Sequence, residues 1–555
     1  MWRKKIKNSS TKGWTQLLFH VLIHNMKTQI AKIPKVPEDE RSPLIEELLQ
    51  ITHQQSELIQ ALKDEIARLK GNKPKPKIKK SKLEKDAKEN KKKDEGKRAG
   101  SEKKSKKNTV EIHETKTVTA TNVPHGSRFK GYETYTVQGL VIKPHNICYR
   151  RERWVTPDGK NIVAPLPADV KALGGHFNVE IVSFILYQYY HAHVTQPLIL
   201  EQLLEYGTDI SSGEVNNIIV EGHDQFHAEK DEILRVGLEV SSYINVDDTG
   251  ARHKGKNGYC THIGNDMFAW FQSTESKSRI NFLKLLRGSY TDYVLNDEAL
   301  AYMRAHNLSK EVLKQFDAKV YQTFPGEAEW ISILESLGIT KKQTIRIATE
   351  GALLGSVAEH GINPDLVVMS DDAGQFNILL HALCWIHAER NIKKICGFTE
   401  TIQAAIDNTL TQIWDLYQNL KAYKNNPAIE TKIELEALFD EIFTQETCSA
   451  LLNGALQRIH KNKAALLLVL DRPEIPLHNN ESERDIREFV KKRKISGSTR
   501  SDNGRRCRDT FASLKKTCRK LGVSFWKYLK DRLSGQNNIP QLPELIREVA
   551  LSPPK

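Results

Sequence analysis

The chain is 555 residues long, carries a formal net charge of +14 at pH 7, and contains 39% hydrophobic and 27% charged residues. This length suffices for two to four domains with a large buried core, and the composition is that of a soluble globular protein with some highly polar segments. The seven cysteines are scattered and form no CxxC pair. Their arrangement argues against a disulfide framework or an ordinary zinc ribbon and favours a reducing cytoplasm.

The N-terminal residues include one apolar stretch, "WTQLLFHVLIH", behind a basic start. It is too short to cross a membrane, it contains His20 and His24, and no small-residue cleavage pattern follows it. We therefore expect no membrane association. We also expect residues 1–25 to be an upstream extension, with Met26 as the natural start.

Residues 44–70 are expected to form a helix, because their apolar positions keep the alternating four-and-three spacing of a coiled-coil seam. The seam positions are Leu44, Leu48, Ile51, Gln55, Leu58 and Leu62, and Ile66 and Leu69 continue it with a one-residue shift. A polar Gln55 in the seam could fix the register. We expect a homo-oligomer through this helix; the alternative is an amphipathic helix docked on its own chain.

The positive charge is concentrated in the segment that follows, residues 71–108. Residues 71–107 contain 16 lysines and one arginine against six acidic residues, a net +11 of the total +14. The segment has almost no apolar residues, so we expect it to be a disordered linker. Such an arm also indicates a polyanionic partner, most often nucleic acid.

Two small modules are expected next. Residues 109–170 contain strand-like pieces at 109–123, 132–143 and 148–156, broken by Pro and Gly, which predict a small β-rich module. Residues 171–236 read as helical, with a helix from Pro197 to Tyr206, a glycine turn, and a second helix that begins at Ser211 or Ser212. This pair fits a helix-turn-helix. Because the second helix, "SGEVNNII", has no Lys or Arg, DNA contact and simple packing both remain open.

From residue 237 the pattern alternates between strands and helices, which predicts an α/β core with helical insertions at about 296–360 and 400–470. "SSYINVDDTG" is expected to be a strand that breaks at its glycine. "KNGYCTHIGNDMFAWFQS" is expected to continue it as a hairpin, and residues 366–369 to form a buried strand. "HALCWIHAERNIKKI" then reads as a helix.

Two pairs of acidic residues follow apolar runs. Asp247 and Asp248 are expected to close one strand, and Asp371 and Asp372 another. Carboxylates at strand ends converge readily on one site, and two such strands with a helical Glu can hold two Mg²⁺ ions for phosphodiester chemistry. Taken singly, each pair has a simpler interpretation as a solvated turn.

A third acidic residue lies in "HNNESERDIREFVKKRK". Asn479 or Asn480 can cap a helix there, which places Glu483 on its first turns. Basic residues follow at three- or four-residue steps or close by, as a phosphate backbone would require: Arg484, Arg487, Lys491, Arg493 and Lys494. The alternative is an exposed helix with ion pairs such as Glu483 to Arg487.

Together these segments resemble a known family. "VDDTGAR", "VVMSDDAGQF", "LCWIHAERNIKK" and "LHNNESERDIREFVKKRKISGSTRS" are similar to successive blocks of the DDE transposases of bacterial insertion sequences, with the insertion sequence 66 family as the closest match. The blocks occur in the family's order over roughly residues 237–500. The N-terminal helix, the basic linker and "VPHGSRFKGYE" with "YRRERW" also resemble the region that precedes that family's catalytic domain.

The resemblance implies a ribonuclease-H-like catalytic core, a mixed sheet flanked by helices, that uses Mg²⁺, with Mn²⁺ as an alternative. The family motifs place the metal-binding catalytic residues on Asp247, Asp371 and Glu483, with Glu481 a less suitable candidate. The implied partners are double-stranded DNA of the element ends and of the target, and accessory proteins of the same element. The implied location is the bacterial cytoplasm, in association with the nucleoid.

The sequence departs from the family in three respects. His478 stands where an aspartate is expected, which should affect helix capping more than metal binding. The cysteines of a zinc finger are missing from residues 109–165, where Cys148 stands alone, so no zinc is expected. Finally, 112 positions separate Asp371 from Glu483, so an inserted helical subdomain must lie between them.

The block "HALCWIHAERNIKK" is ambiguous. His381, Cys384 and His387 are three residues apart, and on one helix they would share a side, so a metal site is conceivable. The alternative is a packed helix with Trp385 in the core. The basic residues that follow could reach phosphates: Arg390, Lys393 and Lys394.

The expected function is that of a transposase that cuts and joins DNA. A nuclease or resolvase on the same fold, a non-catalytic DNA-binding protein derived from a transposase, and a coiled-coil scaffold are the alternatives. The expected domains are 1–43 (extension), 44–70 (coiled coil), 71–108 (linker), 109–170 (β-rich module), 171–236 (helix-turn-helix-like module), 237–500 (catalytic domain) and 501–555 (C-terminal helices).

Overall fold

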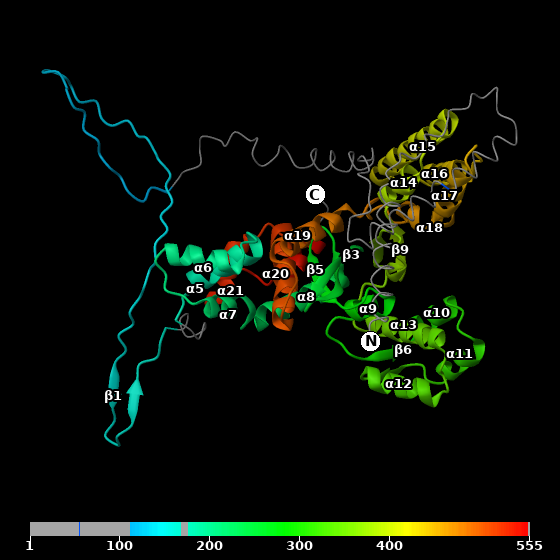
Figure 1. The fold of residues 1–555 in the computed structure, drawn as a ribbon, viewed down its shortest axis with the longest axis horizontal. Coiled ribbons are helices and arrows are strands. Elements are labelled where there is room, and N and C mark those ends of the chain that lie inside the picture. The colour runs from blue at the N-terminus through cyan, green and yellow to red at the C-terminus, as the bar shows by residue number, and fades with distance from the viewer. Residues whose placement is uncertain (1–54, 56–110, 168–175, 553–555) are drawn as a thin grey trace, which may run out of the picture. The chain divides into compact units, whose positions relative to one another are not determined.

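The structure, a computed structural model, describes residue 55, residues 111–167 and residues 176–552 (Figure 1). The expected N-terminal extension, the lysine-rich linker and, apart from residue 55, the coiled-coil helix lie outside the described residues. The chain divides into two compact units. Of the described segments, one unit contains Glu389–Gln418 and Leu435–Lys461, and the other contains the remaining segments from residue 111 onward.

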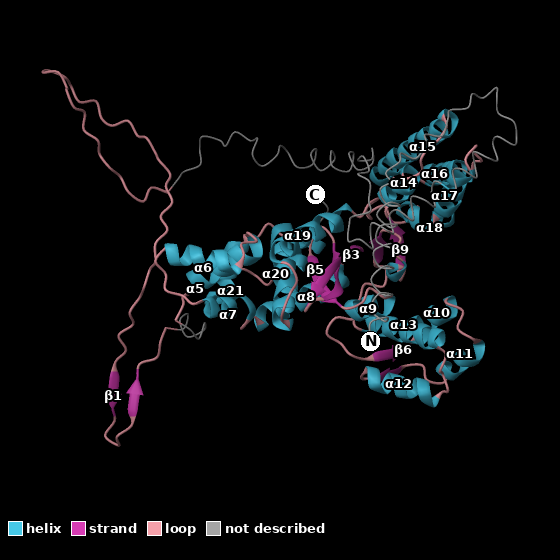
Figure 2. Cartoon of the chain, in the orientation of Figure 1, coloured by secondary structure: helices cyan, strands magenta, loops and turns pink. Residues whose placement is uncertain are grey.

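The larger unit is built on a mixed five-stranded sheet in the order β5-β4-β3-β8-β9. Its strands are β3 (Tyr243–His253), β4 (Lys256–Gly264), β5 (Ala269–Thr274), β8 (Val367–Ser370) and β9 (Leu380–Leu383). The first three pair antiparallel as a meander, and β3, β8 and β9 pair parallel. Helices flank the sheet (Figure 2). The expected α/β core is therefore confirmed.

The sheet forms because its strands alternate apolar side chains toward a shared core. Ile244 and Val246 of β3 and Ile263 of β4 are fully buried in the main hydrophobic cluster. Helix α8 (Asp224–Val240) packs close to the β4–β5 hairpin. At Gly237 a Cβ would lie within 2.6 Å of the Phe268 ring, so only glycine allows this approach.

Helix α20 (Asp502–Lys520) covers the free edge of β5, an edge that would otherwise expose unpaired backbone groups (Figure 1). Three of its side chains, one helical turn apart, accept hydrogen bonds of 2.7–3.2 Å from alternate N–H groups of the strand. The pairs are Asp509 with Ser273, Ser513 with Phe271 and Thr517 with Ala269. The spacing works because one helical turn and two strand residues have nearly the same length.

The helix-turn-helix-like region contains the two expected helices, α6 (Gln196–Glu205) and α7 (Ser212–Val220), which contact each other. Ser211 begins the second helix, as expected, because its hydroxyl accepts a hydrogen bond from Glu214 N at 3.1 Å. Whether this pair binds DNA stays a prediction.

Two secondary-structure expectations outside the aspartate pairs are wrong. Within residues 111–167 the strands are only a short hairpin of β1 (Arg153–Val155) and β2 (Asn161–Val163). The strand-like residues from 111 to 152 have exposed side chains and no assigned strand, since β-branched composition does not by itself supply a neighbouring strand. The segment "HALCWIHAERNIKKI" is not helical throughout. Residues 380–383 pair with β8 as strand β9, and helix α14 (Trp385–Lys393) follows.

The insertions at 296–360 and 400–470 are mostly helical. The remaining elements of the described chain are α5 (Val179–Leu186), a π-helix (Tyr187–His191), α9 (Arg279–Leu286), β6 (Tyr293–Leu295), α10 (Asp297–Ala305), α11 (Lys310–Asp317), β7 (Gln322–Phe324), α12 (Glu327–Ser336), α13 (Lys342–Glu359), a 3₁₀ turn (Gly374–Phe376), α15 (Glu400–Asn425), α16 (Ile429–Thr444), α17 (Ala450–Lys461), α18 (Lys463–Leu466), a 3₁₀ turn (Leu468–Leu470), α19 (Asn480–Ser496), α21 (Phe525–Ser534) and α22 (Leu542–Leu551). Among the residues that the structure describes, none of the helices combines the length and apolar character needed to cross a bilayer.

Candidate active site

The two aspartate pairs lie at the same level of the sheet. The parallel ladder between β3 and β8 joins Tyr243 with Val367 and ends at Asn245 with Met369. Continued by two residues, this register sets Asp247 opposite Asp371. Asp371 directly follows β8, as expected.

The first pair does not close its strand, and that expectation is wrong. β3 continues to His253 because β4 pairs with it along this whole stretch, with Asp247 opposite His262 and Gly250 opposite Tyr259. Gly250 therefore sits inside a paired strand. A hairpin partner is a non-local feature that outweighs the local tendency of glycine to end a strand.

Strand alternation separates the two aspartates of the first pair. Asn245 and Thr249 both contact the α19 segment, through Asn479 at 2.8 Å and Arg493 at 3.5 Å respectively. Since side chains two residues apart share one face of a strand, Asp247 faces α19 and Asp248 faces the opposite side. This geometry favours Asp247 over Asp248 as the partner of Glu483.

Asn479 fixes the start of α19 to β3. Its side-chain amide donates to Val246 O at 2.7 Å and its carbonyl oxygen accepts from Asn245 Nδ2 at 2.8 Å. Asn479 is 1% exposed, so these bonds satisfy a buried polar group. The expected side-chain cap is absent at this residue, because its side chain is engaged by the strand instead. Its backbone N–H donates to the Cys384 sulfur at 3.2 Å.

A buried ionic network anchors the next turns of the helix. His262 on β4 lies 2.6 Å from the Ser482 hydroxyl and 3.2 Å from the Asp485 carboxylate. Two lysines of α20, Lys516 and Lys520, hold the same carboxylate at 3.2 and 3.0 Å. These partners outweigh the effect of burial and hold the pKa of Asp485 far below its usual value. The network locks the helix that carries Glu483 onto the sheet.

Glu483 lies in the first turn of α19, as expected. Its Oε1 is 3.7 Å from His387 Nε2, and each of the two side chains is about a quarter exposed. His387 belongs to α14, whose first residue is tied by a backbone hydrogen bond of 3.0 Å from Trp385 to Leu477. The glutamate is thus held beside a histidine and remains open to solvent.

The pKa of Asp247 is affected by the other expected carboxylates. The pKa of Asp247 is raised to about 7, chiefly by burial and then by the negative charges of Asp371, Asp248 and Glu483. A hydrogen bond of 2.7 Å from the Asp248 N–H to Asp247 Oδ1 only partly offsets these effects. The negative charges of Asp371 and Glu483 therefore both act on Asp247.

The loop after β8 is strained at its second aspartate. Asp372 has a φ of +75°, a left-handed conformation that is unusual outside glycine. Its carboxylate accepts from Asn462 at 3.4 Å, while Asp371 Oδ1 accepts from Ala373 N at 3.2 Å. Strain of this kind concentrates at functional sites.

The donor set suits a hard cation, because carboxylate oxygens are the ligands that Mg²⁺ prefers. Within the described residues, however, no three His, Cys, Asp or Glu side chains already stand close enough to hold an ion. Metal binding would therefore require Asp247, Asp371 and Glu483 to turn toward one another. Asp371 and Glu483 are near enough to Asp247 for their charges to raise its pKa.

The histidines and cysteine of "HALCWIHAER" do not share a helix, so the arrangement behind a metal site there is wrong. His381 lies on β9 and contacts the Ser370 hydroxyl at 2.8 Å. Cys384 is buried and accepts from Asn479 N, and His387 faces Glu483. Trp385 is fully buried in the core.

The basic residues expected to contact DNA fall into two groups. On α19, Arg487, Lys491 and Lys494 are exposed, and Arg484 and Arg493 are half-buried. The other group, Arg390, Lys393 and Lys394, lies in the smaller unit. The α19 group is therefore the one that lies on the same helix as Glu483.

Comparison with known proteins gives two matches. A model of the transposase IS66 family matches residues 358–506. Over 303 residues the chain is 43% identical to "Uncharacterized protein y4jO" of Sinorhizobium fredii (strain NBRC 101917 / NGR234), a match that covers 54% of this chain and 94% of that protein. The chain belongs to the IS66 transposase family. The resemblance seen in the sequence blocks is thereby confirmed.

In this IS66-family transposase, sequence reasoning missed the residues that hydrogen-bond Asp248 or anchor α19 to the sheet. Among these are Asn245, Thr261, His262, Gln375 and Asp485. A signal existed for two of them, because Asn245 and His262 are polar residues at inward positions of apolar strands. Nothing in the sequence indicates which distant residues they contact.

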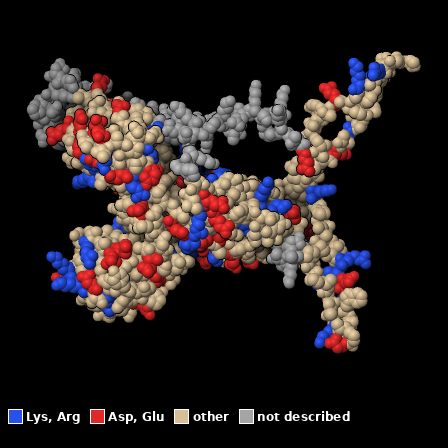
Figure 3. Space-filling view, turned by 180° about the vertical axis from the view of Figure 1, so that it is seen from behind, with Lys and Arg blue, Asp and Glu red and all other residues tan. Residues whose placement is uncertain are grey.

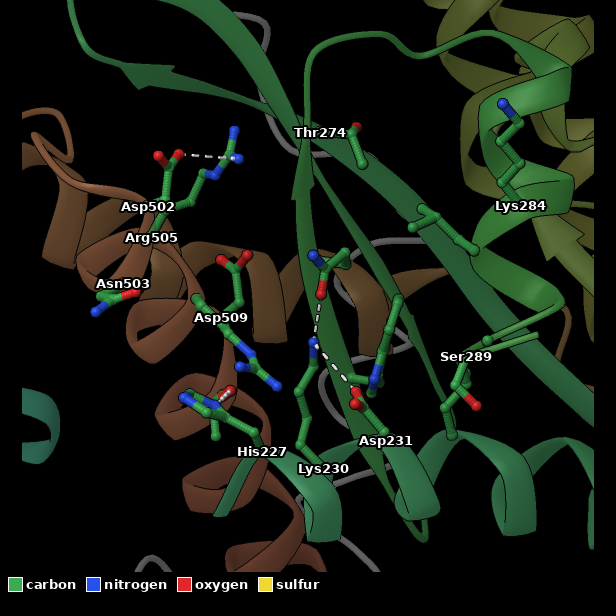
Figure 4. Close-up of a pocket in the computed structure, with 17 residues that line it drawn as sticks. His227, Lys230, Asp231, Thr274, Lys284, Ser289, Asp502, Asn503, Arg505 and Asp509 are labelled. Carbon is green, nitrogen blue, oxygen red and sulfur yellow. Dashed lines mark hydrogen bonds and ion pairs between the residues drawn. The ribbon is translucent and has the colours of Figure 1, made fainter. Parts of the chain in front are cut away.

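The transposase also has a cleft of about 450 Å³ between α8, β5 and the start of α20 (Figure 4). Lys230 lies at its floor, donates to Gln272, and sits 4.4 Å from the centre of the Trp270 ring. Asp509 accepts from the backbone and the hydroxyl of Ser273 at 2.7 and 2.8 Å. The buried charges of this cleft are therefore held by neighbouring protein groups, and Asp247, Asp371 and Glu483 do not line it.

We expect Asp247→Asn to stabilise the metal-free transposase at alkaline pH. Because the folded-state pKa of Asp247 is raised from 3.8 to about 7, the folded protein binds more protons than the unfolded chain between these values. Stability therefore falls as pH rises through that window. Asparagine removes this loss, so its gain in unfolding free energy should be roughly 1–3 kcal/mol at pH 8 and near zero at pH 4.

Thermal unfolding in chelator-containing buffer at several pH values measures this gain. Asp365→Asn, at an exposed carboxylate, serves as the control and should leave the pH dependence unchanged. An Asp247→Asn variant no more stable than the wild type at pH 8 would show that ionised Asp247 does not destabilise the folded protein.

Proposed function

We propose that this IS66-family transposase cleaves DNA at the ends of its element and joins the freed 3′-hydroxyl to target DNA. Asp247, Asp371 and Glu483 would be its catalytic residues. One observation carries the proposal: burial, and then the negative charges of Asp371, Asp248 and Glu483, raise the pKa of Asp247 to about 7. A strongly perturbed carboxylate beside other acidic groups is typical of catalytic centres.

The fold supports the same proposal. A ribonuclease-H-like core is the fold that the resemblance implies, and three antiparallel strands followed by two parallel ones are consistent with it. The proposed carboxylates come from adjacent parallel strands and from a helix anchored on the sheet.

Mg²⁺, or Mn²⁺ in its place, would be held by Asp247, Asp371 and Glu483. When bound, it would help to form the attacking oxygen and stabilise the leaving one in phosphodiester chemistry. Water attacks the phosphodiester at the element's end, the P–O bond breaks, and a 3′-hydroxyl is left. That hydroxyl then attacks a phosphodiester of the target and displaces its 3′-oxygen.

Within this reaction the protein's own groups orient the carboxylates. The Asp248 N–H holds Asp247 Oδ1, and Ala373 N holds Asp371 Oδ1. Asn479 keeps the start of α19 against β3, which limits the movement of Glu483. These contacts restrict the positions of the carboxylates, which metal binding would still have to turn toward one another.

DNA would reach the site along α19. Arg487, Lys491 and Lys494 are exposed at steps of three or four residues, so they can follow a phosphate backbone. On the face of the molecule seen in Figure 3, basic and acidic side chains are interspersed. A short basic stripe on one helix is therefore a more specific candidate than the surface as a whole.

Substitution of the carboxylates tests the catalytic assignment. Asp247→Asn, Asp371→Asn and Glu483→Gln should each abolish cleavage and joining in Mg²⁺, because each removes a charged ligand. DNA binding should change little, since none of the three carries a positive charge. The assay uses labelled DNA that flanks the gene, together with a target plasmid.

Two other outcomes would change the conclusion. Cleavage without joined product would favour a nuclease on the same fold, and cleavage retained in all three variants would contradict the assignment. Loss of activity in Asp248→Asn, with Asp247→Asn active, would place the metal-binding carboxylate on the other face of β3.

The salt dependence of DNA binding tests the α19 stripe. The triple variant Arg487→Ala, Lys491→Ala and Lys494→Ala should flatten the plot of log K against log salt by about 0.9 for each phosphate that the helix no longer neutralises. Lys310→Ala with Lys314→Ala, two exposed cations on α11, is the matched control. An unchanged slope in the triple variant would exclude this helix as a phosphate-binding surface.

A further inference from the structure

The carboxylate of Asp248 is held by two neighbours. Thr261 Oγ1 on β4 donates to its Oδ1 at 2.6 Å, and Gln375 Nε2 donates to its Oδ2 at 3.0 Å. Its backbone N–H donates to the carboxylate of Asp247 at 2.7 Å. Asp248 thus connects β4, the proposed catalytic Asp247 and the loop that contains Gln375.

Gln375 belongs to the loop that carries the other proposed catalytic aspartate, four residues after Asp371. The same loop also contacts helix α9. Arg279 Nη2 donates to Gly374 O at 2.5 Å, and the ring centres of Phe376 and Phe282 lie 4.9 Å apart. The loop is therefore joined to β3 through Gln375 and to helix α9 through Gly374 and Phe376.

The Asp248–Gln375 bond lies where backbone pairing has stopped. The ladder between β3 and β8 ends at Asn245 with Met369. No strand hydrogen bonds therefore join the two segments at the level of Asp247 and Asp371. The side-chain bond from Gln375 to Asp248 spans this gap between the two segments.

We propose that Asp248 and Gln375 act as positioning residues: their hydrogen bond sets the spacing of Asp247 and Asp371 for divalent-cation binding. This inference rests on the proposed function, because it assumes that those two aspartates share an ion. Neither residue needs to touch the ion. Outer groups that orient metal ligands commonly change metal affinity by about 10–100-fold when removed.

The test measures Mn²⁺ binding directly, by the loss of the free-ion signal in electron paramagnetic resonance, with full-length protein. Gln375→Met keeps the side chain's length but removes the donor. It should weaken Mn²⁺ binding by about tenfold. Gln225→Met, at an exposed glutamine of α8, is the control and should bind as the wild type does.

An exchange of the two side chains tests whether the hydrogen bond itself, and not the identity of residue 375, supports Mn²⁺ binding. In the double variant Asp248→Asn with Gln375→Glu, the amide and the carboxylate trade places, so the hydrogen bond re-forms in reverse with the same total charge. Its Mn²⁺ affinity should return to within about twofold of the wild type. Thermal unfolding without metal should be similar for Gln375→Met, the double variant and Gln225→Met, whereas a purely structural role would lower stability and leave Mn²⁺ affinity unchanged.

The outcomes distinguish the two proposals. Wild-type affinity in Gln375→Met, or a double variant as weak as Gln375→Met, would overturn the positioning role while leaving the proposed function intact. If Asp247→Asn left Mn²⁺ binding unchanged, that result would overturn the shared site itself, and the positioning role with it.

Discussion

The burial of the Asp247 carboxylate among other acidic side chains is the constraint on which the proposed site depends. Burial, and then the negative charges of Asp371, Asp248 and Glu483, raise the pKa of Asp247 to about 7, so its ionised form is costly in the folded chain. A cation bound beside it would offset this cost. The surrounding core is the framework that holds the elements carrying these carboxylates.

That framework has two layers of polar contacts. Asn479 joins α19 to β3, and the buried Asp485 joins it to His262 and to two lysines of α20. Helix α20 in turn covers the edge of β5 with three evenly spaced side chains. Since buried polar groups are costly when unpaired, this chain of contacts allows few alternative positions for Glu483.

The sequence predicted the elements that carry the site better than their contacts. The strand before Asp371 and the helix with Glu483 in its first turn were predictable, because apolar runs and helix signals are local patterns. The sequence did not predict that β3 continues past Gly250 or that residues 380–383 form a strand, because each depends on a neighbouring strand. The contacts of Asp485 and Gln375 were not predictable either, since their partners lie far away in sequence.

The central claim is that Asp247 shares one cation site with Asp371 and Glu483 and must lose a proton to bind the ion. Calorimetric titration with Mn²⁺, in buffers of different ionisation enthalpy, counts the protons released on binding. The account predicts release of about one proton per site near pH 6, almost none near pH 8.5, and loss of this release in Asp247→Asn. Mn²⁺ binding without proton release near pH 6, or unchanged release in Asp247→Asn, would contradict it.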